Sequence, residues 1–294
     1  MLCPRRCGVD RFVRTGVCGA NDTLRVGRAA LHWWEEPCLV GDRGSGAVFF
    51  AHCALGCVYC QNKRLAEGEG VEITQERLHE ILLELQNEQR AANINLVTAS
   101  HYAPSVAEVL RELRASGALH IPVVWNTSGY ESAQTLALLE GLVDIYLVDF
   151  KYSNPTTAQR LSHASDYVGV ALVAIEQMIE QTGAPRSSEE GYLERGVIVR
   201  HLVLPGYVDD SLAALDLLYP RIRGRALLSI MNQFTIVDET LDVRAYGLER
   251  AVSDEAYERV LDHADELGFE DYFWQEGGAA SESFVPAFDG TGVL

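Results

Sequence analysis

After residue 43, short apolar runs alternate with amphipathic segments, and this alternation limits the folds open to the chain. Apolar runs separated by helical segments are typical of parallel strands, which need a long crossover between them. Strands are predicted at 46–52, 95–98, 121–125, 144–150, 197–204 and 226–231. Helices are predicted at 74–90, 106–115, 131–140, 156–163, 167–181, 210–219 and 253–267. This order indicates right-handed βαβ units and a parallel sheet.

Six predicted strands are two fewer than a closed eight-stranded barrel contains. We therefore expect an α/β fold in which residues 44–294 form a partial (β/α)6 TIM-like barrel with a C-terminal helix. Residues 1–43 are expected to form a Cys-rich N-terminal extension. Active sites of such barrels lie just past the carboxyl ends of the strands. The polar residues at these positions are Cys53–Cys60, Thr98–His101, Asn126–Ser128, Asp149–Lys151, His201 and Asn232–Gln233.

All seven cysteines lie within the first 60 residues. An odd number of cysteines, with no apolar signal segment before them, argues against a disulfide framework and favours metal or redox chemistry. A cytoplasmic protein is expected, with no membrane partner, because no apolar run approaches the length of a bilayer span. The formal net charge of −18 argues against a nucleic-acid partner, since phosphates would be repelled.

Three of these cysteines, Cys53, Cys57 and Cys60, directly follow the first predicted strand. Three thiolates can hold a cubane iron–sulfur cluster and leave one iron open, whereas four would close the site. A structural zinc ion would require a fourth ligand. His52 could supply a fourth ligand, but it is adjacent to Cys53 on the predicted strand, so the two side chains are expected to point to opposite faces. The spacing therefore favours a [4Fe-4S] cluster.

The pattern Cys-x3-Cys-x2-Cys, with Tyr59 before the last cysteine, resembles the signature of the radical S-adenosylmethionine (SAM) superfamily. The resemblance implies that the open iron binds the amine and carboxylate of SAM. One electron from the reduced cluster would then cleave SAM to a 5′-deoxyadenosyl radical, which abstracts hydrogen from a substrate. It also implies a low-potential electron donor of the flavodoxin or ferredoxin type.

Three further segments resemble an uncharacterised radical SAM subgroup related to pyruvate formate-lyase activating enzyme. They are Cys-Pro-Arg-Arg-Cys-Gly-Val at 3–9, Leu-His-Trp-Trp-Glu-Glu-Pro at 31–37 and Gly-Ser-Gly-Ala-Val-Phe-Phe at 44–50. The resemblance implies an oxidoreductase whose SAM-binding residues are Tyr59, Thr98, Ser100, His101, Asn126, Ser128, Asp149, Lys151, Arg200 and His201. The aromatic and acidic residues at 33–36 are expected to pack, with lining of the substrate side as the alternative.

One departure from the pattern concerns the SAM amine. Many radical SAM enzymes bind it with a Gly-Gly-Glu-like run after the second strand, where this chain has Thr98-Ala99-Ser100-His101. The amine partner is therefore left open among Thr98, Ser100 and His101.

Cys3, Cys7 and Cys18 form a second candidate metal group, for zinc or an iron–sulfur centre. Related proteins usually carry a further cysteine three positions before the equivalent of Cys3, so the fourth ligand is expected upstream or from a substitute such as Cys38. Free thiols without a metal are the alternative.

Three functions stay open at this point. The first is a radical SAM enzyme that acts on a peptide or protein, including an activase that forms a glycyl radical on a partner. The second is a radical SAM enzyme that acts on an unrelated small molecule. The third is a non-catalytic iron–sulfur or zinc-binding protein.

Overall fold

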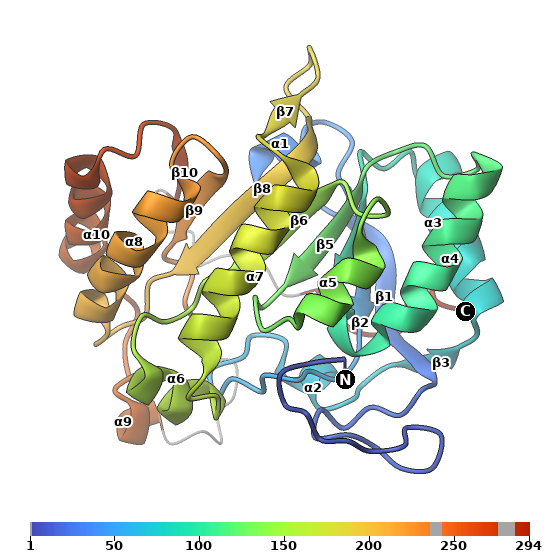
Figure 1. Ribbon diagram of the computed structural model, residues 1–294, viewed down its shortest axis with the longest axis horizontal. Helices are drawn as coiled ribbons and strands as arrows, with labels where there is room; N and C mark the ends of the chain where they lie inside the picture. The colour runs from blue at the N-terminus through green and yellow to red at the C-terminus, as the bar shows by residue number, and fades with distance from the viewer. Residues whose placement is uncertain (1, 236–242, 276–285) are drawn as a thin grey trace.

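The computed structural model describes residues 2–235, 243–275 and 286–294, and its centre is one curved sheet (Figure 1). The strand order along the sheet is β10-β9-β8-β6-β5-β4-β2-β1-β3. The strands are β1 (Leu24–His32), β2 (Ser45–Phe50), β3 (Val71–Ile73), β4 (Ile94–Val97), β5 (Val123–Thr127), β6 (Ile145–Asp149), β8 (Leu193–Leu202), β9 (Leu227–Met231) and β10 (Tyr272–Trp274). A two-residue strand, β7 (Arg186–Ser187), pairs with β8 in a segment for which the sequence predicted no strand.

The predicted partial barrel is confirmed. Strands β2, β4, β5, β6, β8 and β9 correspond to the six predicted strands, and each pairs in parallel with the next. Their middle residues are almost entirely buried, as parallel strands with both faces covered require. Parallel pairing brings the carboxyl ends of all six strands to one edge of the sheet, where the polar loops therefore meet.

Helices cover the outer face of the sheet (Figure 1). The helices in the described ranges are α1 (Pro37–Val40), α2 (Lys63–Ala66), α3 (Gln75–Asn87), α4 (Ala103–Ser116), α5 (Ala133–Leu139), α6 (Pro155–Ser162), α7 (Tyr167–Thr182), α8 (Val208–Ile222), α9 (Val243–Tyr246) and α10 (Asp254–Leu267), with a 3-10 turn, η1, at Ser100–Tyr102. The short helices α1 and α2 pack against the opposite face, through Leu39 and Leu65. Thr74 and Ser253, the first residues of two predicted helices, are N-caps that each accept a hydrogen bond from a first-turn N–H, 3.2 Å long. No helix in the described ranges is long and apolar enough to cross a membrane.

The sheet is longer than predicted at both ends. Strand β1 lies in the predicted N-terminal extension and pairs antiparallel with β2 and β3. Strand β1 was not predicted from the sequence, because Gly27 lies at a register shift and Arg25 and Arg28 interrupt the apolar pattern. At the other end, the short strand β10 pairs in parallel with β9.

The strand predicted at 46–52 ends at Phe50 in the structure, so His52 lies outside the strand. Strand β2 ends at Phe50, and His52 has a φ of 72°, so the alternation of a strand does not set its direction. Its ring lies instead against Gly19 and Gly68, where a Cβ would come within 2.8 and 2.5 Å of ring atoms.

We expect Gly46→Ala to lower the free energy of unfolding by about 1–3 kcal/mol, because a Cβ there would lie 2.9 Å from both Ala91 Cβ and Asn93 O. The control is Gly169→Ala, where helix α7 leaves open space around the new methyl group. It should stabilise the chain by about 0.5–1 kcal/mol. Urea denaturation of both variants measures the difference, and equal stabilities would contradict the close approach at Gly46.

Candidate active site

A cavity of about 210 Å³ lies at the carboxyl ends of the parallel strands. Residues from β2, β4, β5, β6, β8 and β9, or from the loops that follow them, contribute to its wall. Its polar and sulfur-bearing lining residues include Cys57, Cys60, Tyr59, Gln61, Asn62, Thr98, Asn126, Ser128, Asp149, Lys151, Arg200 and Gln233. The strand-end loops that the sequence marked as polar therefore share one space.

The cysteine loop forms one side of this cavity. Cys57 and Cys60 line it, and Cys53 is a partly buried free thiol whose sulfur lies 3.4 Å from the N–H of Leu55. Burial raises the pKa of Cys57 and brings that of Cys60 to about 12, and the neighbouring sulfurs act in the same direction. A metal centre bound by these sulfurs would displace their protons, as metal coordination does for thiols.

The chemistry of the loop fits an iron–sulfur cluster. It offers three soft sulfur donors, and Ser162 Oγ donates to Cys57 Sγ at 3.0 Å, a contact of the kind that tunes cluster sulfur ligands. Among the described residues, no group of three or more His, Cys, Asp or Glu side chains has the geometry of a metal site. The loop therefore suits an iron–sulfur cluster through the sulfur chemistry of its side chains and their place in the cavity, although the three sulfurs do not surround one point.

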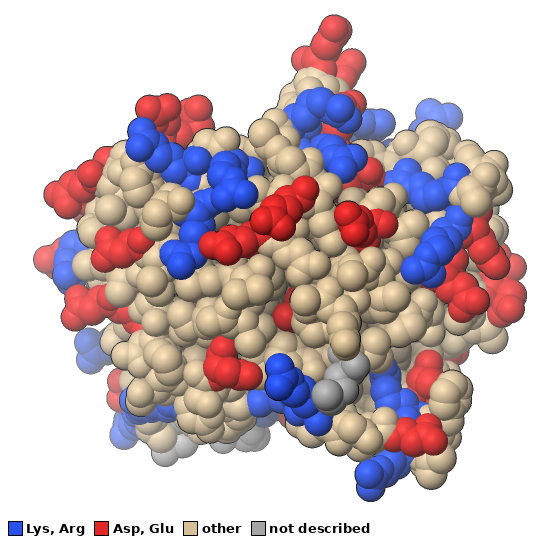
Figure 2. All heavy atoms as spheres, in the orientation of Figure 1, with Lys and Arg blue, Asp and Glu red and all other residues tan. Residues whose placement is uncertain are grey.

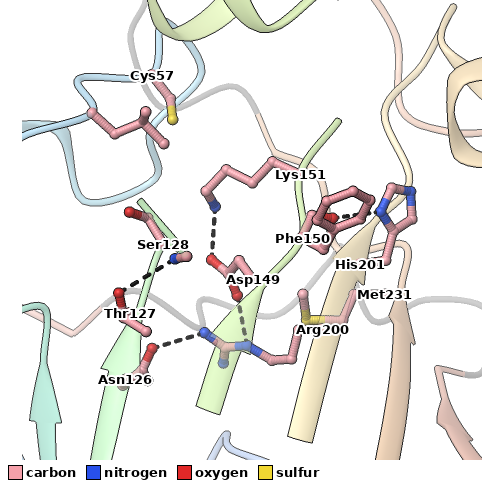
Figure 3. Close-up of polar contacts among 12 residues, drawn as sticks. Cys57, Asn126, Thr127, Ser128, Asp149, Phe150, Lys151, Arg200, His201 and Met231 are labelled. Atoms are coloured by element: carbon pink, nitrogen blue, oxygen red, sulfur yellow. Dashed lines mark hydrogen bonds and ion pairs between the residues drawn. The ribbon is translucent and has the colours of Figure 1, made fainter. Parts of the chain in front are cut away.

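Opposite the cysteine loop, Asp149 lies between two cations (Figure 3). Its carboxylate accepts from Lys151 Nζ at 2.7 Å and from Arg200 Nε at 2.8 Å. Burial alone would raise the pKa of Asp149, but Arg200 and Lys151 lower it to about 2. Burial would likewise lower the pKa of Lys151, whereas Asp149 and Cys57 raise it. All three side chains therefore stay charged at neutral pH inside the protein.

Glu35, which was not among the expected SAM-binding residues, extends this charged group. Its side chain is 6% exposed and accepts from Arg200 Nη1 at 3.0 Å and from Asn95 Nδ2 at 3.0 Å. Arg200 Nη2 also donates to Asn126 at 2.9 Å. Glu35, Arg200, Asp149 and Lys151 thus form a chain in which acidic and basic side chains alternate. Burial raises the pKa of Glu35, and Arg200 opposes that shift.

The expectation that residues 33–36 pack is corrected for this segment. Trp33 and Trp34 are about half exposed, at 49% and 50%, whereas Glu36 is buried and only the side chain of Glu35 is largely buried. Trp34 and Glu35 both line the cavity. The sequence feature that could have indicated this buried site is the pair of acidic residues directly before Pro37 in an otherwise apolar segment.

Glu131 is a second residue that the sequence analysis did not single out. Its Oε1 accepts hydrogen bonds from Ser100 Oγ at 2.5 Å, Thr127 Oγ1 at 2.7 Å and Trp125 Nε1 at 3.1 Å. These donors come from β5 and from the loop after β4. Glu131 therefore fixes the two loops relative to each other from behind the cavity.

The structure divides the expected SAM-binding residues into two groups. Seven of them line the cavity: Tyr59, Thr98, Asn126, Ser128, Asp149, Lys151 and Arg200. Ser100, His101 and His201 do not. Ser100 is bound to Glu131, His101 Nε2 contacts Ala51 O at 2.8 Å, and His201 Nδ1 contacts Phe150 O at 2.7 Å.

The N-terminal cysteines meet at a different place. Cys3, Cys7 and Cys18 line a cavity of about 160 Å³, together with the buried His101. Cys38, the suggested substitute ligand, is elsewhere, packed against the small core cluster that contains Leu39 and Val124. Burial raises the pKa of its thiol to about 12.

Removal of the central cation should be costly. We expect Arg200→Met to lower the free energy of unfolding by about 3–5 kcal/mol, because the buried carboxylate of Asp149 would lose one of its two cations and Glu35 would lose its ion pair. Arg195→Met is the matched control on the same strand, since Arg195 binds only the carbonyls of Gln181 and Thr182. Chemical denaturation of both variants measures the effect, and similar losses would contradict the central role of Arg200.

Comparisons with known proteins agree with this geometry. A family model for the radical SAM superfamily matches residues 48–218. An uncharacterized protein of Methanocaldococcus jannaschii is 27% identical over 241 residues, which cover 79% of this chain and 65% of that protein. The chain thus spans just under two thirds of the length of this curated relative.

Two solved structures share the fold. A radical SAM methyltransferase from Sphaerobacter thermophilus has a TM-score of 0.56 and 14% identity, over 81% of this chain and 68% of that one. SuiB from Streptococcus suis, solved with S-adenosylmethionine bound, has a TM-score of 0.51 and 10% identity, over 80% of this chain and 47% of that one. Identities this low show the architecture alone. The family model, however, covers more than half of the chain, including the cysteine loop, and the chain belongs to the radical SAM superfamily.

Proposed function

We propose that this enzyme holds a [4Fe-4S] cluster with Cys53, Cys57 and Cys60 and uses SAM to abstract hydrogen from a peptide or protein substrate. The observation that carries the proposal is the convergence of Cys57, Cys60, Asp149, Lys151 and Arg200 on one cavity. A non-catalytic iron–sulfur protein has no need of such a charged wall opposite its cysteines.

When bound, the cluster supplies the one electron that cleaves SAM into methionine and a 5′-deoxyadenosyl radical. The side chains of the chain hold SAM in place. Lys151 donates one of its three N–H groups to Asp149, and the remaining N–H groups can donate to the SAM carboxylate. Of the three candidates for the SAM amine, Thr98 alone lines the cavity, and Ser128 offers a second hydroxyl there. We therefore assign the amine to these two hydroxyls.

A peptide substrate is supported by the amide groups at the cavity wall. Gln61, Asn62 and Gln233 line it, and Gln61 Nε2 donates to the backbone carbonyl of Gln233 at 2.8 Å. Primary amides pair well with a peptide backbone because each offers a donor and an acceptor. SuiB, which shares the fold, has been solved with its precursor peptide SuiA. A glycyl-radical activase is the narrower form of this proposal, and a small-molecule substrate is the alternative.

The cluster assignment predicts the behaviour of cysteine variants. After anaerobic reconstitution with iron and sulfide, reduction in the presence of SAM should yield 5′-deoxyadenosine. The triple variant Cys53→Ala/Cys57→Ala/Cys60→Ala should lose both the cluster absorbance and this product, since no thiolates remain to bind the iron. Cys38→Ala is the control and should keep both. Full cluster absorbance in the triple variant would refute the assignment.

A second metal at Cys3, Cys7 and Cys18 is also part of the proposal. The three thiols line one cavity with His101, whose Nδ1 is a buried nitrogen without a hydrogen-bond partner among the described residues. Three thiolates and one imidazole are a donor set that zinc favours. Binding would require the side chains to close around the ion, because they do not form a metal site as they stand.

This second site can be measured without the cluster. In a background that carries the triple cysteine variant, we expect about one zinc or iron per chain by elemental analysis. Cys7→Ser and His101→Asn should each lower that content severalfold, whereas Cys38→Ser should leave it unchanged. An unchanged metal content in Cys7→Ser would contradict the site.

A further inference from the structure

The N-terminal extension differs in charge from the rest of the molecule. Residues 2–20 contain four arginines and a single aspartate, in a chain with a formal net charge of −18. In Figure 2, blue side chains lie at the lower edge of the view, beside a few red ones, where Figure 1 places the extension. Residues 2–20, the first part of the extension, are thus a basic segment of an acidic protein.

The extension lies directly on the outer side of the cysteine loop. Arg5 Nε donates to Ala54 O at 2.8 Å, and Arg5 Nη2 donates to Leu55 O at 3.0 Å. Arg5 Nη2 also donates at 2.9 Å to the carbonyl of Ser162, the residue whose hydroxyl binds Cys57. One guanidinium therefore connects the extension to the backbone between Cys53 and Cys57.

A second contact lies at the other end of the extension. The backbone of Gly19 lies against the ring of His52, so closely that a Cβ would be 2.8 Å from His52 Nδ1. His52 directly precedes Cys53 in the chain. Val17 is two residues from Gly19, a separation of about 7 Å at most. The loop that contains Val17 is thus held beside the cysteine loop.

This loop carries exposed apolar side chains. Phe12 is 84% exposed, Val13 79% and Val17 67%, and Arg14 between them is also exposed. We call Phe12, Val13, Arg14 and Val17 the N-terminal patch. Aromatic and aliphatic groups that surround an arginine are typical of surfaces that bind another protein.

We propose that the N-terminal patch docks a small acidic protein that carries a single low-potential electron. The inference rests on the proposed function, in which the cluster must be reduced before SAM is cleaved. SAM and substrate occupy the cavity side, so the electron must arrive from the outer side of the cysteine loop, where the extension lies. The carrier gives one electron to the cluster and is itself oxidised by one electron.

Charge complementarity selects the acidic class of carrier. A negatively charged carrier is repelled by most of this surface and attracted by the basic extension, so that encounter is steered toward the cysteine loop. Phe12, Val13 and Val17 would then be buried in the complex, which compensates for the weak net attraction of screened charges.

The test compares two reductants in the reconstituted enzyme. The variant is Phe12→Ser/Arg14→Glu, and the matched control is Val173→Ser/Arg225→Glu, which changes an exposed valine on α7 and an exposed arginine before β9. Formation of 5′-deoxyadenosine is measured with reduced acidic flavodoxin and, separately, with dithionite. At low salt, the variant should form 5′-deoxyadenosine at least about tenfold more slowly than the unaltered enzyme with flavodoxin, and at the same rate with dithionite. High salt should narrow the difference.

Other outcomes would overturn the proposal, each for its own reason. An unchanged rate with flavodoxin shows that the patch does not dock the carrier. An equal loss in the control shows that net charge alone is responsible. An equal loss with dithionite shows that the patch acts through the cluster itself. If the unaltered enzyme yields no 5′-deoxyadenosine with dithionite, the proposed function fails, and the docking proposal fails with it.

Discussion

The ion pairs of Asp149 link the strand ends into one site. This carboxylate ends β6, and its two partners come from the residue two positions on and from β8. A buried carboxylate is tolerated because two cations offset the cost of its burial, and they keep its pKa near 2. Glu35 balances the second cation from outside the barrel strands. The wall of the cavity is thus ordered before any ligand arrives, which is how a site limits reorganisation during a reaction.

Much of this arrangement could be predicted from the regular alternation of strands and helices along the sequence. Strands that alternate with helices must end at one edge, so a polar residue after each strand falls in a common place. That reasoning placed Asp149 and Lys151 at the edge of the sheet where the cysteine loop lies, whereas Arg200 was indicated by the family resemblance. The spacing of the cysteines adds donor chemistry that few other residues could supply. Neither inference needs any detail of side-chain packing.

The rest depends on contacts that no local pattern encodes. Glu131 resembles an ordinary first-turn helix residue, and only the folded chain shows that Ser100, Thr127 and Trp125 all donate to it. His101 and Ser100 follow a strand, as the cavity residues do, yet the 3-10 turn at Ser100–Tyr102 directs them away from the cavity. Glu35 precedes α1 and does not follow a strand, so the rule that places active-site residues at strand ends did not apply to it.

The antiparallel strand β1 has a consequence for the modularity of the chain. It covers the edge of β2, and the segment that follows it delivers Glu35 to the cavity. A fragment that began at residue 44 would expose an apolar strand edge, which invites aggregation, and would leave Arg200 with one carboxylate fewer. The first 43 residues are therefore not a detachable module. Recombination with other barrels would have to exchange them together with the sheet.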